Sequence, residues 1–317
     1  MLTAAALASL AAPALAQQAE SWPNRPVRIV VPFVPGGPTD VSVRIVAEQL
    51  RQRLGQPFVI ENRGGAGGLL GAQLVAQAAP DGYTLLYTSS SVAIGPSLQP
   101  GLGFDPLRDL APVSLVTDVA TTLVVRPDAP MGSIADLVSR AKASPGSLSY
   151  GTSGVGSSNH LTAALLAFTA GIELLHVPFR GTTQATAALF GHNIDMVFAS
   201  TAETLAHYRD GKVRVLGVAT ASRLPEMPDV PTIGETLPGY VAPNWFALFG
   251  PAAISPVIVG RLEAELSAIG RLSAVRDQFA TLGITPLMSN ASTMRARMAE
   301  DVPTWRRVVQ QAGIRAE

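Results

Sequence analysis

The segment RIVVPFVPGGPTDVSVR, residues 28–44, predicts a buried strand, a loop rich in proline and glycine, and the start of a helix. The β-branched run 29–31 favours a strand, and apolar residues then recur from Val41 at helical spacing, which predicts a helix to about Leu54. Pro38 suits the first helical turn, because its missing N–H would have no partner within the helix anyway. The segment therefore indicates an α/β fold with a loop at the carboxyl end of a strand.

This loop has the properties of an anion site. Its glycines let the backbone approach a ligand, and a helix that begins there directs unpaired N–H groups and the positive end of its dipole at the same place. An alternative stays open, in which Asp40 caps these donors and no ligand binds. The candidate ligand-binding residues are Phe33 as an apolar wall, Pro35, Gly36, Gly37, Pro38, Thr39 and Asp40.

The composition is that of a globular protein with room for about two domains. Its 317 residues are 47% hydrophobic and 15% charged, and the formal net charge is +0, which gives no field to attract nucleic acid or anionic lipid. The chain has no cysteine, which excludes disulfides, thiolate metal sites and a catalytic thiol. The glycine run 62–71 fails the dinucleotide-binding spacing because Leu70 stands where a glycine is needed. We expect no cofactor, no metal and no catalytic residue.

Residues 1–16 form an alanine-rich apolar run that ends in Ala-Leu-Ala, the pattern that precedes signal cleavage. We interpret residues 1–16 as a signal peptide and expect the mature protein to be free in the periplasm; the alternative is the N-terminus of a cytosolic protein. The apolar stretch 241–259 is interrupted by prolines, so it predicts a strand and a helix start and not a membrane span.

The chain then alternates strands with helices. In the first half we predict strands at 58–61, 83–88, 111–116 and 121–125, the last two as an adjacent pair, and helices at 72–79 and 133–143. The serines that follow the strand 83–88 lie where ligands sit in open α/β sheets, although serines also cap helices. Both readings stay open for the candidates Ser89 and Ser90.

A second glycine loop, residues 151–160, again joins a strand to an apolar helix, predicted at 161–170. Two such loops are better explained by a shared ligand than either alone. Their hydroxyls can bind a carboxylate or cap their own helix, whereas His160 is interpreted as structural because no third group orients a Ser–His pair. The candidates in this loop are Thr152, Ser153, Gly154, Gly156, Ser157 and Ser158.

The remaining candidates follow later strands. Arg180 can pair with a second ligand carboxylate or with Asp195, Ser200 precedes a helix, and Asn244 lies where the chain crosses back before the strand 245–249. Further strands are expected at 194–199 and 213–219, and helices at 182–190, 256–269, 273–282 and from 292, the last kinked at Pro303. We assign 22–118 plus 243–317 to lobe I and 119–242 to lobe II, with the ligand cleft between them.

Several motifs together resemble one known family. The chain resembles the substrate-binding proteins of tripartite tricarboxylate transporters, the Bug or TctC-type receptors, over nearly its whole mature length. No single motif is decisive, but their order and spacing are specific. The matching segments are Trp22 to Pro26, Pro-Phe-x-Pro-Gly-Gly-x-x-Asp at 32–40 with Arg44, 61–67, 80–86, the loop 151–160 and 177–181.

The resemblance implies a type II periplasmic-binding-protein fold, in which two α/β lobes joined by crossing hinge strands close on a small carboxylate. It also implies that main-chain groups and ordered waters of the loops 35–40 and 152–158 hold the ligand carboxylate, and that the receptor, expected to be a monomer, delivers it to a pair of membrane proteins. Phe179 stands where the family often has tyrosine.

Two other function classes remain as alternatives. A periplasmic serine hydrolase would use a serine of the 152–158 loop with His160, but the Gly-x-Ser-x-Gly elbow is absent. A ligand-sensing subunit of a signalling system would present the closed form to another partner. The sequence does not separate sensing from transport, and it does not identify the carboxylate.

Overall fold

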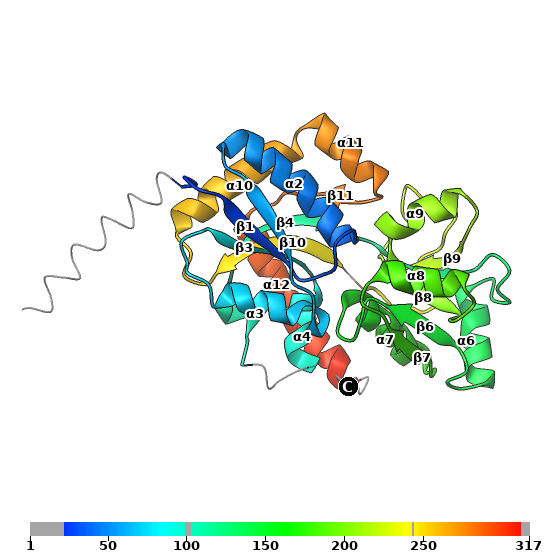
Figure 1. The fold of residues 1–317 in the computed structure, drawn as a ribbon. Helices are drawn as coiled ribbons and strands as arrows, with labels where there is room; N and C mark the ends of the chain where they lie inside the picture. The colour runs from blue at the N-terminus through cyan, green and yellow to red at the C-terminus, as the bar shows by residue number, and fades with distance from the viewer. Residues whose placement is uncertain (1–21, 99–102, 243, 312–317) are drawn as a thin grey trace, which may run out of the picture.

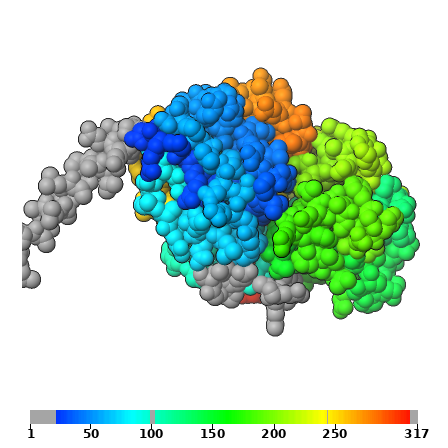
Figure 2. Space-filling model, in the orientation of Figure 1, coloured from blue at the N-terminus to red at the C-terminus, as the bar shows by residue number. Residues whose placement is uncertain are grey.

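The computed structural model describes residues 22–98, 103–242 and 244–311. They form two α/β bodies, one mainly blue, cyan and orange and the other green in Figure 1, which contact each other in Figure 2. The predicted signal peptide, residues 1–16, lies outside the described residues. Within the described part of the chain, no helix combines the length and apolar character that a membrane crossing requires.

The first body contains a six-stranded sheet of order β11-β4-β10-β3-β1-β2. Strands β1, β2 and β3 are parallel, whereas β10 runs antiparallel between β3 and β4, and β11 pairs antiparallel with β4. The carboxyl ends of the parallel strands therefore meet at one edge, as the α/β prediction requires. The bounds are β1 Val27–Val31, β2 Phe58–Asn62, β3 Thr84–Ser89, β4 Leu110–Asp118, β10 Trp245–Pro251 and β11 Thr285–Pro286.

Helices cover both faces of this sheet. Ile29 and Val31 of β1 pack in a cluster with residues of α2, α10 and α11, whereas Val30 packs in another cluster with residues of α3, α4 and α12. A strand that alternates between two buried faces needs a continuous apolar run, which explains the β-branched residues at 29–31. The helices are α2 Pro38–Leu54, α3 Leu69–Ala76, α4 Ser91–Leu98, α5 Pro106–Asp109, α10 Pro256–Gly270, α11 Ser273–Thr281 and α12 Ala291–Gln311, with the short turn η1 Ala66–Gly68 before α3.

The second body contains a five-stranded sheet of order β7-β6-β8-β5-β9. Strands β6, β7 and β8 are parallel, and β5 lies antiparallel between β8 and β9. Its strands are β5 Thr121–Val125, β6 Ser149–Thr152, β7 Leu175–Pro178, β8 Met196–Ser200 and β9 Arg214–Val218; its helices are α6 Ile134–Ala143, α7 Ser158–Ala170, α8 Thr182–Phe190, α9 Thr201–Arg209 and the turn η3 Ile233–Glu235.

The chain crosses from the first body to the second between β4 and β5, and it crosses back before β10. The two strands predicted at 111–116 and 121–125 lie in different sheets: β4 pairs with β10 and β11, and β5 pairs with β8 and β9. The two crossings contact each other where the Val119 N–H donates to the Asn244 carbonyl at 3.0 Å. Near the end of α12, Trp305 and Val309 pack with core residues of the second body. The exact lobe boundaries stay a prediction.

Two helix predictions also change. The helix expected at 72–79 occupies Leu69–Ala76, because the glycines before it form the turn η1 with positive φ at Gly67 and Gly68. No helix is predicted at 91–98, where α4 begins at Ser91, the last residue of the serine run. The last helix continues through Pro303 to Gln311.

Candidate functional site

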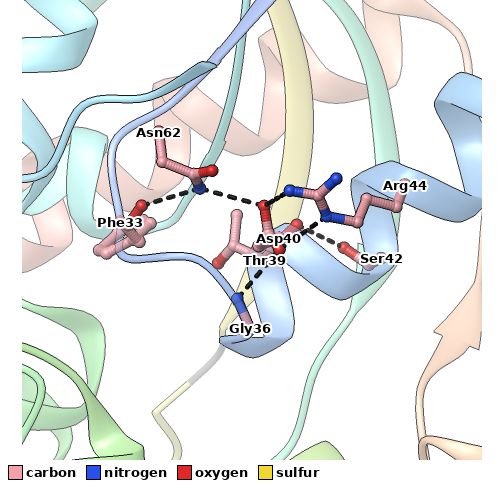
Figure 3. Close-up of polar contacts among 7 residues, drawn as sticks. All are labelled: Phe33, Gly36, Thr39, Asp40, Ser42, Arg44 and Asn62. Carbon is pink, nitrogen blue, oxygen red and sulfur yellow. Dashed lines mark hydrogen bonds and ion pairs between the residues drawn. The ribbon is translucent and has the colours of Figure 1, made fainter. Parts of the chain in front are cut away.

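The N-terminus of α2 has no side-chain cap. Gly37 is the N-cap residue in an extended conformation, and Pro38 takes the first helical position. Asp40 does not serve as the cap that one alternative expected. Its carboxylate accepts hydrogen bonds from the Gly36 N–H at 3.0 Å, from Arg44 at 2.8 and 3.0 Å, and from Asn62 at 3.0 Å (Figure 3). Asp40 therefore holds the loop before α2 in place without capping the first turn of this helix.

The charge state of Asp40 follows from these contacts. Burial alone would raise the pKa of Asp40, but the hydrogen bonds from Arg44, Gly36 and Asn62 outweigh it and hold the pKa below its usual value. Asn62 also donates to the Phe33 carbonyl at 3.0 Å, so the loop is tied at both ends (Figure 3). A rigid loop presents the first turn of α2 in one orientation.

The loop before α7, in contrast, satisfies its own polar groups. Ser157 is the N-cap residue: its hydroxyl accepts from the His160 N–H and donates to the Gly154 carbonyl at 2.6 Å. Asn159 lies at the centre of the network, because its Oδ1 accepts from Ser153 at 3.0 Å and from Ser157 at 2.6 Å. Its Nδ2 donates to the Phe198 carbonyl on β8 at 2.9 Å.

The two histidines of this region are structural. The His160 and His176 rings stack with centroids 4.1 Å apart, the Gly156 N–H donates to His160 Nδ1, and His176 Nε2 contacts the Thr152 hydroxyl at 2.7 Å. Burial lowers the pKa of His160 to about 3 and that of His176 to about 4. Ser157 bonds to the His160 backbone and not to its ring, so this geometry does not form the Ser–His pair of a hydrolase.

A cavity, called the main cavity below, lies between the two bodies and has about 600 Å³ of atom-free space, part of which is open to solvent. It unites ten of the predicted residues from both bodies, which supports the interpretation that the two loops share one site. These ten are Phe33, Gly37, Pro38, Thr39, Ser89, Ser153, Ser158, Arg180, Ser200 and Asn244. A second, wider cavity adjoins it through Phe33, Val34, Ser153 and Arg180, and also includes Gly154.

Other predicted residues do not line the main cavity. Ser90 donates to Asn244 Oδ1 at 2.8 Å, and the Thr152 hydroxyl is held by His176. The Gly36 and Gly156 N–H groups have partners within their own loops. The predicted residues that do not line this cavity are Pro35, Gly36, Asp40, Ser90, Thr152, Gly154, Gly156 and Ser157, and direct ligand contact by them stays a prediction.

Arg180 lines both cavities, and of the two partners considered for it, Asp195 is wrong. The Asp195 carboxylate instead accepts from the Ser149 N–H and hydroxyl at 2.8 and 2.7 Å. Among the described residues that line the main cavity, Arg180 and Glu203 are the charged ones.

Eight residues that line the cavity were not predicted from the sequence: Val34, Thr121, Asn159, Gly181, Thr182, Thr183, Glu203 and Phe246. Two sets of these residues could have been predicted from local sequence patterns. The run Gly181-Thr182-Thr183 opens a predicted helix, and Ser200-Thr201-Ala202-Glu203 has the spacing of a capping box. Asn159 and Thr121 have no local signal, since their roles depend on contacts with distant strands.

Four helices direct their N-termini at this cavity: α2, α7, α8 and α9, two of them with side-chain caps and two without. In α9 the Glu203 carboxylate and Ser200 form a capping box, and in α7 Ser157 is the cap. In α2 and α8 the N-cap residues are Gly37 and Gly181, with no side-chain cap. Helix N-termini without caps attract anions through their N–H groups and dipole.

Two mixed sheets, joined by crossing segments around a cleft lined with uncapped helix N-termini, define the class of bilobed binding proteins for anionic solutes. The family model for the "Tripartite tricarboxylate transporter family receptor" matches residues 42–314. The chain belongs to this family.

Related proteins match this chain in sequence or structure over nearly its whole length. Protein BugT of Bordetella pertussis is 36% identical over 311 residues, which cover 97% of this chain and 94% of that protein. The solved structure of R. palustris Rpa4515 with adipate is 32% identical, has a TM-score of 0.87 and covers 93% of this chain and 99% of its own. MatC from Rhodopseudomonas palustris with bound malate is 34% identical, with a TM-score of 0.85 and coverage of 91% and 100%. The predicted family and its α/β binding-protein fold are confirmed.

Proposed function

We propose that this protein is a monomeric periplasmic receptor that captures a small carboxylated metabolite between two lobes, residues 22–118 with 243–317 and residues 119–242. It delivers the ligand to the membrane components of a tripartite tricarboxylate-type transporter. The family membership supports this, and so do two similar structures, one with adipate and one with bound malate.

The observation that carries the proposal is the pair of uncapped helices that face the main cavity from different bodies. Gly37 and Thr39 lie at the start of α2 beside the first sheet, and Gly181 and Thr183 at the start of α8 beside the second. A carboxylate between them receives backbone donors from both bodies, so its full affinity requires that the bodies close. Arg180 adds a cation to the same wall.

We assign the direct ligand contacts to the ten predicted residues that line the cavity, together with Thr182 and Thr183. Ser158 offers a hydroxyl and Phe33 an apolar wall. The Ser89 and Ser153 hydroxyls already donate to Ser91 at 2.9 Å and to Asn159 at 3.0 Å, so each must turn to donate to a carboxylate. Asp40 and Ser157 act behind this surface by fixing the loops, and Asn159 fixes its loop from the cavity wall itself.

We also propose that the protein binds its ligand without altering it, and that residues 1–16 direct its export. Ser157 bonds to the backbone N–H of His160 and not to its ring. The hydroxyl that does contact an imidazole, Thr152 with His176 Nε2 at 2.7 Å, does not line the main cavity. Among the described residues, no group of three side chains suited to a metal ion is found.

A thermal-shift screen tests the receptor function. The mature protein is heated with mono-, di- and tricarboxylic acids and, as matched controls, with the amides of the same acids. An acid at 100 times its dissociation constant stabilises the folded state by about 2.7 kcal/mol, whereas its amide, which lacks the charge, should not. Equal stabilisation by acid and amide, or none by any acid, would contradict the proposal.

A further inference from the structure

Glu203 holds an unusual position on the cavity wall. It is the third residue of α9, and its Oε2 accepts from the Ser200 hydroxyl at 3.0 Å and from the Ser200 N–H at 3.3 Å. The Thr182 side chain on α8 lies near enough to lower the pKa of this carboxyl group. Both Ser200 and Thr182 line the main cavity, so Ser200 fixes the carboxyl group beside the proposed ligand.

The other carboxyl oxygen has no partner. Glu203 Oε1 is buried and has no hydrogen-bond partner among the residues that the structure describes, and the same holds for the Thr121 hydroxyl at the start of β5. Thr121 is only 1% exposed and lines the same cavity. Buried polar atoms without partners are rare and costly in folded proteins. Two of them on the wall of one cavity point to a polar group that arrives with the ligand.

The charges around Glu203 decide what kind of group this is. Glu203 also borders a small cavity behind α9, and among the described residues that line the two cavities the titratable or charged neighbours are Arg180 and His207. Burial raises the pKa of Glu203 to about 7, although the hydrogen bonds from Ser200 and the nearby Thr182 side chain lower it in part. Above neutral pH, Oε1 is therefore an acceptor that lacks a donor.

We propose that Glu203 is a specificity-determining residue, whose Oε1 accepts a hydrogen bond from a hydroxyl or ammonium group of the bound carboxylate, with the Thr121 hydroxyl as a second partner. The ligand class is then the hydroxy acids or amino acids. This inference rests on the proposed receptor function and adds the chemistry of the ligand's second polar group.

The variant Glu203→Gln reverses the polarity of this contact. The Ser200 N–H and hydroxyl require an acceptor at the Oε2 position, so the amide oxygen takes that place and the NH₂ group takes the place of Oε1. The unpaired acceptor becomes a donor. A ligand with a hydroxyl or ammonium group should lose its partner, and a ligand with a carbonyl at that place should gain one.

The experiment measures dissociation constants by calorimetry at pH 8.5 for two matched sets of acids. The first set is lactate, alanine, pyruvate and propionate, and the second is 2-hydroxyglutarate, glutamate, 2-oxoglutarate and glutarate. In each set that binds, the hydroxy or amino acid should bind the wild type more tightly than the oxo acid by on the order of tenfold to a hundredfold. The tighter of the two tells hydroxyl from ammonium. In Glu203→Gln this preference should vanish or reverse.

A matched control is Glu235→Gln, because Glu235 is the third residue of the other capping box, in η3, and does not line this cavity. It should keep the wild-type preference. If Glu203→Gln does not fold, the wild type at pH 5.5 gives the same answer, since protonation also makes Oε1 a donor. There the preference should fade, and His207→Gln should leave that pH dependence in place.

Equal preference in the wild type and Glu203→Gln, with no change between pH 8.5 and pH 5.5, would overturn the inference while the acids still bind. Binding of no acid in either set or in the wider carboxylate screen would overturn the receptor function and this inference with it. The two failures are thus distinguishable.

Discussion

The helices that meet at the cavity fall into two kinds, and the difference shows where a ligand anion fits. In α7 and α9 the first turn is capped by Ser157 and by Ser200 with Glu203, so the protein satisfies its own donors. In α2 and α8 a glycine precedes the first turn and no side chain caps it. The uncapped pair comes from opposite bodies, and for this reason we propose that the anion binds between α2 and α8, with α7 and α9 as the supporting wall.

This comparison changes the role of the loop 151–160. Its similarity to the loop 34–40 predicts that both hold the carboxylate, yet its serines bond mainly to Asn159 and to the backbone. Asp40 has the opposite effect in the first loop, because it bonds to Gly36 and Arg44 and leaves the helix start uncapped. In our proposal, the ligand anion accepts from the first-turn N–H groups of α2, as the Ser157 hydroxyl does at α7.

The largest expected effect comes from Thr39→Asp, which places a negative charge in the first turn of α2. Thr39 is buried and lines the cavity. Like charges about 4 Å apart cost on the order of 4 kcal/mol at an effective dielectric of 20, or about three decades of affinity. Folding should survive, because a carboxylate at a helix N-terminus is favourable by roughly 0.3 to 1 kcal/mol. The measurements are the melting temperature without ligand and the dissociation constant of the best acid.

The matched control for this change is Ala135→Asp, at the equivalent second position of α6, which is exposed and away from the cavity. It should bind like the wild type. Unchanged affinity in a stably folded Thr39→Asp variant would place the ligand elsewhere and remove α2 from the comparison.

The next effect concerns the closure that brings α2 and α8 together. A Cβ atom added at Gly67 would lie 2.8 Å from the Val155 carbonyl oxygen of the second body. Gly67→Ala should therefore keep the bodies apart and weaken ligand binding by roughly 1 to 3 kcal/mol, the usual cost of overpacking. Gly211→Ala is the control, because Gly211 has a similar φ of +67° and nothing within 4 Å.

Titration calorimetry on both glycine variants separates strain from obstruction. Each variant carries the cost of a left-handed alanine, but only Gly67→Ala obstructs the contact between the bodies. Equal loss of affinity in the two variants would show that the Gly67 contact has no part in closure.

The sequence predicted α2 well, because its signals are local. Proline at the first helical position, glycines before it and a β-branched strand fix the unit without distant contacts. The α7 loop could not be resolved in the same way. Whether Ser153 and Ser157 face the ligand depends on Asn159, which is held by the Phe198 carbonyl of another strand. Glu203 combines a local and a distant signal. Its capping box can be predicted from the sequence, whereas its burial beside α8 cannot.

A smaller effect tests the second body through pH. The pKa values of His160 and His176, about 3 and about 4, lie below the usual 6.5, so the unfolded chain binds more protons and stability falls as the pH drops below 6.5. Each histidine contributes roughly 1.4 kcal/mol per pH unit in the middle of this range. Glu203, with a pKa raised to about 7 from 4.5, acts in the opposite direction between pH 7 and 4.5.

The net loss from pH 6 to pH 5 should therefore be about 1 kcal/mol in the wild type and about 2 kcal/mol in Glu203→Gln, where the opposing group is absent. Urea denaturation at the two pH values measures this. A wild type that gains stability over this range would contradict the assignment of the histidines as buried and neutral. A variant with the same loss as the wild type would contradict the raised pKa of Glu203.

The smallest expected effect is the most specific test of the α2–α8 pair. It concerns α8, whose first turn was not predicted from the sequence to bind the ligand. Thr183→Asp adds a charge at the second position of α8, the same position in its helix as Thr39 in α2, but Thr183 is exposed. In bulk water, like charges about 4 Å apart cost only about 1 kcal/mol, so affinity should fall roughly fivefold and recover in part at high salt. Thr183→Asn, of equal size and without charge, should bind normally. If Thr39→Asp abolishes binding and Thr183→Asp leaves it unchanged at low salt, the anion rests on α2 alone, and closure must then depend on the capped helices of the second body.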